Sequence, residues 1–165
     1  MAAMIQPLAV AATLPGLTQA LGIGETVSYF HTAKSGPSID GFRDVFVAAA
    51  AYAVKNGIKH VVLAVHTKTN LHGVISDAIG ENTVKSLEKG HVKLVSDVDL
   101  DLTTERIAIP TNDKYVLVAA HTSTKYLKTL ESNPMCAAVF FAPWQDAELA
   151  DFIERHGSDE IRANA

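Results

Sequence analysis

Five short runs of β-branched and apolar residues have the length and composition of strands. They are residues 26–30, 60–65, 91–97, 115–120 and 137–142. The run at 60–65 is almost continuously apolar, which is typical of a strand buried on both faces of a sheet.

Between these runs, apolar residues recur at a spacing of three and four positions, which predicts helices. The segments concerned are residues 41–57, 70–89, 123–132 and 146–157. Ser38 is a suitable N-cap for the first of them, and Asn56 with Gly57 is a suitable end. Gly80 is expected to interrupt the second helix.

The alternation of strands and helices predicts an α/β fold. We expect a three-layer sandwich with a mostly parallel five-stranded sheet, in the order 3-2-1-4-5 when the strands are numbered along the chain. Residues 97–110 alternate without a helical stripe, so a β-hairpin excursion is expected there. No linker interrupts residues 25–165, which are expected to form a single domain.

Composition agrees with one globular domain and argues against several classes of partner. Hydrophobic residues make up 48% and charged residues 19% of the chain, as in ordinary globular proteins. A net charge of −4 with scattered basic residues argues against nucleic-acid binding. The single cysteine, Cys136, excludes an intramolecular disulfide and fits a reducing compartment, so we expect a cytoplasmic protein with a buried, inert thiol.

Residues 1–24 differ from the rest of the chain because they contain no charged side chain. A secretory signal would begin with basic residues, and Pro7 and Pro15 leave apolar runs too short to span a membrane. We therefore expect no membrane association. The segment is predicted to be a packing arm or a pair of short helices, which covers an edge of this domain or of a neighbouring copy in a homo-oligomer.

Three of the predicted strands run into a His-Thr pair at their carboxyl ends. The histidines are His31 after strand one, His66 after strand two and His121 after strand four. In the expected order these three strands are neighbours, and ligands of open α/β sheets bind at this edge, where the strand order reverses. We therefore expect the three imidazoles to meet around one small ligand.

Hydroxyl side chains and a lysine also stand where two of the helices begin. Free backbone N–H groups and the helix dipole favour a phosphate at such a position. The same residue types are ordinary helix caps, so a purely structural role is the alternative. The candidate ligand-binding residues are His31, Lys34, His66, Thr67, Lys68, Thr69, Asn70, His121, Thr122, Ser123 and Thr124.

The stretch VSYFHTAKSGPSIDGFRDVFVAAAAYAVKNGIKHVVLAVHTKTN, residues 27–70, resembles the opening βαβ unit of the pyruvate kinase C-terminal-like domain family. The matching features are the YF strand, the Gly-Pro loop, the Ala-rich helix ending in NGIKHVV, and Thr-Lys-Thr after strand two. The resemblance implies an α/β fold and a phosphate held by Thr67, Lys68 and Thr69. Asn70 and Leu71 replace the glycine and second serine that usually follow in the family.

Three functions are compatible with these features. The first is a binding or regulatory domain for a small phosphorylated or anionic metabolite, without a cofactor. The second is a metal-dependent enzyme in which His31, His66 and His121 hold the ion, with Asp97 as a further ligand. The third is a non-catalytic oligomeric assembly protein that uses residues 1–24. The sequence leaves open whether the protein is an enzyme.

Overall fold

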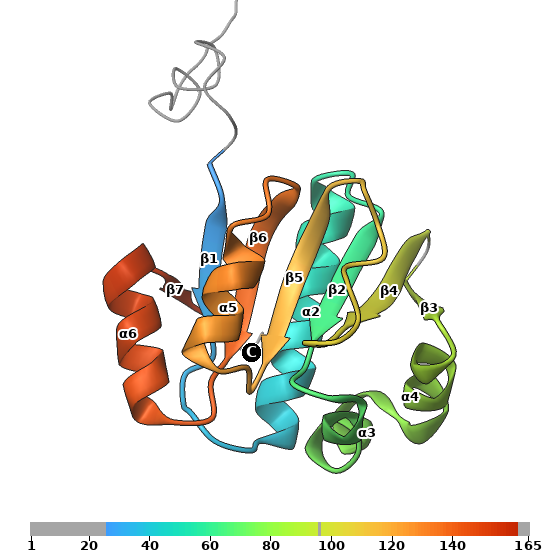
Figure 1. Ribbon diagram of the computed structural model, residues 1–165, viewed down its shortest axis with the longest axis horizontal. Coiled ribbons are helices and arrows are strands. Elements are labelled where there is room, and N and C mark those ends of the chain that lie inside the picture. Colours follow the sequence, from blue (N-terminus) through green and yellow to red (C-terminus); the bar gives the residue numbers. More distant parts are fainter. Residues whose placement is uncertain (1–25, 96, 162–165) are drawn as a thin grey trace, which may run out of the picture.

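The computed structural model describes residues 26–95 and 97–161, so the expected arm at residues 1–24 lies outside the described part. One seven-stranded mixed sheet runs through the domain in the order β3-β4-β2-β5-β6-β1-β7 (Figure 1). The strands are β1 (Ser28–His31), β2 (His60–Ala64), β3 (His91–Val95), β4 (Val98–Thr103), β5 (Tyr115–Ala120), β6 (Cys136–Ala142) and β7 (Asp159–Glu160). Among these strands β3 pairs antiparallel with β4, and the other neighbouring pairs are parallel.

The predicted strand order, 3-2-1-4-5, is wrong. β1 does not lie between β2 and β5 but pairs with β6 on one side and β7 on the other. β2 and β5 are direct neighbours, in register from His60 opposite Tyr115 to Ala64 opposite Ala119. The physical reason is burial, because β5 is buried along its whole length and belongs at the centre, whereas most of β1 is only half-buried.

Two strands were not predicted as members of the sheet. The segment expected to form a hairpin excursion at residues 97–110 instead begins with β4, which runs parallel to β2 and forms a hairpin with β3. A tight turn follows, in which the backbone N–H groups of Thr104 and Ile107 each donate to the carbonyl of the other, at 3.1 and 3.2 Å. The short β7 extends the sheet beside β1.

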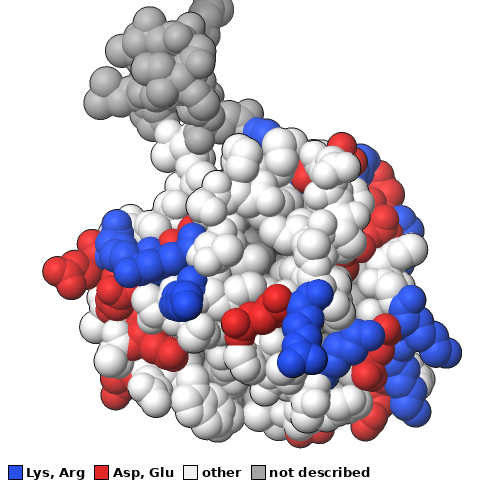
Figure 2. All heavy atoms as spheres, in the orientation of Figure 1, with Lys and Arg blue, Asp and Glu red and all other residues white. Residues whose placement is uncertain are grey.

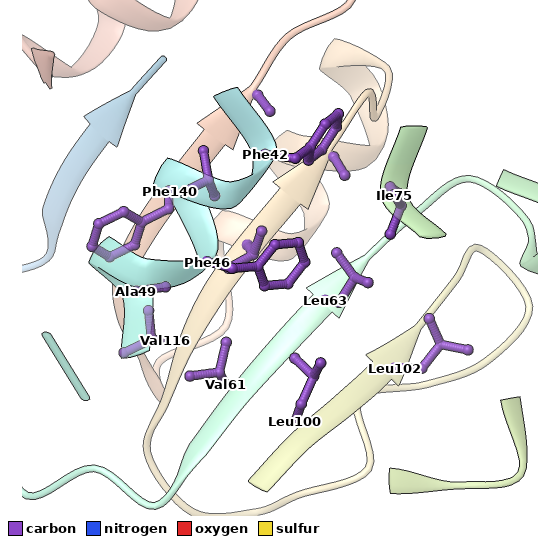
Figure 3. Close-up of a cluster of buried hydrophobic side chains, with 14 of the residues drawn as sticks. Phe42, Phe46, Ala49, Val61, Leu63, Ile75, Leu100, Leu102, Val116 and Phe140 are labelled. Carbon is purple, nitrogen blue, oxygen red and sulfur yellow. The ribbon is translucent and has the colours of Figure 1, made fainter. Parts of the chain in front are cut away.

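Helices cover both faces of the sheet, so the three-layer α/β sandwich is confirmed. The helices are α2 (Ile39–Lys55), α3 (Val74–Ile79), α4 (Glu81–Glu88), α5 (Thr124–Glu131) and α6 (Asp146–His156), with the 3₁₀ turn η2 (Lys68–Leu71). The first three pack on one face and the last two on the other (Figure 1). In Figure 3, Phe46 of α2 points toward Leu63 of β2 within the larger of the two buried apolar clusters.

Local sequence signals explain where the helices begin and end. The Ser38 hydroxyl accepts a hydrogen bond from the backbone N–H of Gly41 at 3.0 Å, as expected for the N-cap of α2. The predicted interruption at Gly80 is confirmed, and the segment before it is divided again into η2 and α3. Gly73 and Gly80 stand at the divisions with φ of 92° and 98°, which favour glycine. No helix within residues 26–95 and 97–161 is long and apolar enough to cross a membrane.

Candidate functional site

The carboxyl edge of the parallel strands contains two places where the chain leaves neighbouring strands toward opposite faces. After β2 the chain passes to the face of α3, whereas after the adjacent β5 it passes to the face of α5. The same divergence separates β1, which leads into α2, from the adjacent β6, which leads into α6. Such switch points leave crevices in which the ligands of open α/β sheets bind.

A hollow of about 550 Å³ opens at the ends of β2 and β4, beside the first switch point. We call it the basic hollow, and it is lined by His66, Thr67, Lys68, Thr104, Glu105, Arg106 and Ile107. Figure 2 shows basic and acidic side chains close together on the lower right of this face, in the region of α3, α4 and the carboxyl end of β2. Three of the predicted ligand-binding residues, His66, Thr67 and Lys68, therefore share one concave site.

The two loops that form the basic hollow are joined by hydrogen bonds and an ion pair. The backbone N–H of Val65 donates to Thr103 O at 3.2 Å, and that of Glu105 donates to His66 O at 3.4 Å. The His66 Nδ1 atom also lies within ion-pair distance of the Glu105 carboxylate. These contacts fix the relative position of segments that are far apart in the sequence.

The two basic side chains of the hollow, Lys68 and Arg106, differ in their hydrogen bonding. Lys68 Nζ donates to the Glu88 carbonyl at the end of α4, at 3.3 Å. The Arg106 side chain is exposed, and its guanidinium has no hydrogen bond or ion pair to any residue that the structure describes. An unpaired guanidinium beside a lysine favours an anionic ligand.

Several hydroxyl groups are buried near the carboxyl edge of the sheet. Thr103, Thr104 and Thr122 are buried, with 2%, 6% and 0% of their surface exposed. The hydroxyls of Thr122 and Tyr126 are buried without a hydrogen-bond partner among the described residues. Burial raises the pKa of Tyr126; the nearby Thr103 hydroxyl acts in the opposite direction, and the Glu105 carboxylate raises it further.

The three histidines do not meet around one ligand, because each ring has partners of its own. His31 is buried, and its Nδ1 lies 2.7 Å from Ser158 Oγ beside β7. His121 packs edge-on against Phe42 and Trp144, with ring centroids 5.0 and 4.7 Å apart. β6 separates β1 from β5, which places their ends two strand spacings, or about 10 Å, apart. The expectation of a shared histidine site depended on the incorrect strand order.

A histidine-ligated metal centre is not supported by the side chains that the structure describes. Among them, no group of three or more His, Cys, Asp or Glu residues is placed to hold a metal ion. Asp97, the expected further ligand, forms an ion pair with Lys59 instead. The hydrogen bond from Lys59 is the main cause that lowers the pKa of Asp97.

The remaining predicted residues are dispersed along the carboxyl edge. Lys34 lines a second hollow, of about 380 Å³, between β1 and the start of α2. The Ser123 hydroxyl accepts from the backbone N–H of Tyr126 at 3.2 Å, so it caps α5, and Thr124 is the first residue of that helix. Thr69 and Asn70 belong to η2, where Asn70 Oδ1 accepts from the Thr67 backbone N–H at 2.9 Å.

Sequence reasoning missed Thr104, Glu105 and Arg106. They follow β4, which was expected to leave the sheet rather than to lie beside β2. The available signal was the alternation of apolar residues at Val98, Leu100 and Leu102, which are all buried. Read as a strand of the sheet, this segment would have placed residues 104–106 at the carboxyl edge.

His121 and His31 are expected to make the stability of the domain depend on pH. Burial is the largest cause that lowers the pKa of both rings from the ordinary 6.5, although nearby groups oppose it, among them Glu160 for His31 and the Gly36 backbone for His121. Below this ordinary value the unfolded chain binds more protons than the folded one. The free energy of unfolding should therefore fall as the pH decreases from about 7 through 6.

Denaturant unfolding between pH 5 and 8 measures this dependence. The variant His121→Asn should reduce the slope, because asparagine does not titrate and tolerates the φ of 54° at this position. The matched variant His91→Asn, on the exposed strand β3, should keep the wild-type slope. An unchanged slope in His121→Asn would contradict the prediction.

Together, the fold and the rim define an α/β sandwich with a basic hollow at the carboxyl edge of its sheet. None of the family models, curated proteins or solved structures compared with the chain matches it. The resemblance of residues 27–70 to the pyruvate kinase C-terminal-like family therefore stays a prediction.

Proposed function

We propose that the protein is a binding domain for a small phosphorylated or otherwise anionic metabolite, which the basic hollow holds. The observation that carries the proposal is the convergence of Lys68 and Arg106 on one hollow from two different strand ends. Glu105 is the one carboxylate in its lining, and it is already paired with His66. The hollow therefore presents more positive than negative charge.

Each cation has a distinct part in this binding. A guanidinium donates two parallel hydrogen bonds to a phosphate or carboxylate, so Arg106 would orient the ligand. Lys68 acts as a point charge, and its Nζ is held at the Glu88 carbonyl at the end of α4. The volume of about 550 Å³ lies in the range typical of small-molecule sites.

Titration of the purified protein with inorganic phosphate and with pyrophosphate, followed by calorimetry and by thermal unfolding, tests the proposal. Saturable binding is expected, with about 2.7 kcal/mol of stabilisation at a ligand concentration one hundred times Kd. Arg106→Ala and Lys68→Ala should each raise Kd by about 10- to 100-fold, since each removes a charge-assisted hydrogen bond.

Lys89→Ala is the matched control, because Lys89 is exposed at the end of α4 and does not line the hollow. It should bind with the wild-type Kd. Absence of saturable binding to either anion, or wild-type affinity in both Arg106→Ala and Lys68→Ala, would refute the proposal.

A further inference from the structure

The outer side of α2 is unusually apolar for a helix at the surface of a domain. Residues 45–54 (VFVAAAAYAV) carry no charge, and Val47 and Val54 are 61% and 54% exposed in the described structure. By contrast, α5 presents lysines such as Lys125 and Lys128 to solvent. A helix that is apolar around its whole circumference is typical of one covered on all sides.

An apolar groove adjoins this side of α2. It has a volume of about 310 Å³ and is lined by Phe30, Ala48, Ala51, Tyr52, Lys55, Phe140, Glu160 and Ile161. Positions 47, 51 and 54 follow one another at a spacing of four and three residues, so they lie on one side of the helix. We call the surface formed by Val47, Ala48, Ala51, Tyr52 and Val54 the α2 face. A continuous apolar surface of this kind marks an interaction site.

The start of the described chain lies beside this surface. The Tyr52 hydroxyl donates to Ser28 Oγ at 3.3 Å, which joins the carboxyl end of α2 to the first residue of β1. The residues that precede β1 therefore begin next to the α2 face. Those residues, 1–24, contain no charged side chain and are rich in alanine and leucine.

The length of this segment also matches the length of the α2 face. A helix over residues 15–22 would be about 12 Å long, and Val47 and Val54 are separated by about 10 Å along the axis of α2. Leu17 and Leu21 would share one side of such a helix. Because the segment is tethered at Thr26, its effective concentration at the α2 face is in the millimolar range, far above that of a second copy in dilute solution.

We propose that residues 7–22 dock on the α2 face of their own chain and bury Val47 and Val54. The inference is independent of the anion site, because the α2 face and the basic hollow share no lining residue. The arm would complete the helical layer on this side of the sheet.

The reactivity of a cysteine placed on the α2 face tests the proposal. Val54→Cys, in the full chain and in a chain lacking residues 2–22, is treated with a thiol reagent such as Ellman's reagent. The full chain should react about tenfold more slowly, since covering this apolar surface favours the docked arm by at least that factor. Cys136 contributes little, because it is buried and burial raises its pKa to about 12.

Two controls make the result specific. Lys128→Cys, on the outer side of α5, should react at the same rate with and without the arm. In the full chain, Leu17→Glu combined with Leu21→Glu should restore fast reaction at position 54, because the charges prevent docking. Phosphate binding should be unchanged in the shortened chain.

Equal rates at position 54 with and without residues 2–22 would overturn the proposal. Protection that falls on dilution, together with a doubled mass in light scattering, would also overturn it, because the arm would then sit on a second copy. Protection at a constant monomeric mass is the expected result.

Discussion

Replacing Phe152 with alanine is expected to lower the free energy of unfolding by about 3–5 kcal/mol. Phe152 is fully buried on the inner side of α6. The centroid of its ring lies 6.0 Å from the ring centroid of Tyr29, 4.8 Å from that of Phe141 and 5.0 Å from that of His156. The substitution would leave a cavity where α6, β1 and β6 meet, and the rigid sheet cannot collapse into it.

Urea or guanidinium unfolding measures this loss. Ile153→Ala is the matched control, because it removes an apolar side chain from the adjacent position of the same helix, where 38% of the residue is exposed. The control should cost less than about 1 kcal/mol. Similar losses in the two variants would show that α6 does not pack on the sheet through Phe152.

The elements themselves were largely predictable, because their signals are local. The apolar runs that became β2, β5 and β6 are confirmed as buried strands. Ser38 caps the start of α2, as predicted. Gly157 ends α6 with a φ of 59°, a conformation that glycine adopts readily. Such features need only a few neighbouring residues, so the sequence pattern carries them directly.

The order of the strands was not predictable by the same means. A helix such as α2 is long enough to return to the next strand or to pass over two others, and its apolar stripe is the same in both cases. Two exposed residues, Asp159 and Glu160, form β7, and a strand so short has no periodic pattern. Only long-range packing decides these features.

In the candidate site, too, residues within a local motif were predictable, and residues brought together by strand pairing were not. Thr67 and Lys68 were found because they belong to one short motif after a buried strand. Arg106 was not found, because its proximity depends on the pairing of β4 with β2. The predicted histidine cluster was wrong because it was inferred from local similarity alone. Each histidine precedes a threonine at the end of a strand, but the three strands are not all adjacent.

A second large effect is expected at Glu131, which joins α5 to α6. Its carboxylate is 8% exposed and accepts from Arg155 Nη1 at 2.7 Å, while His156 Nε2 lies 3.0 Å from the same oxygen. Burial acts to lower the pKa of Arg155, but the hydrogen bonds to Glu131 and Asp151 raise it. The guanidinium therefore stays charged and depends on these two carboxylates.

Glu131→Ala should lower the free energy of unfolding by about 3–5 kcal/mol, because it leaves a largely buried guanidinium without its main partner. Asp151→Ala is the control: it removes the other carboxylate of Arg155, at 2.7 Å but 39% exposed, and should cost less than about 1 kcal/mol. The double variant Glu131→Ala, Arg155→Met should be more stable than Glu131→Ala alone, since no unpaired charge remains. Equal stabilities of these two variants in denaturant unfolding would show that the loss comes from packing and not from the stranded charge.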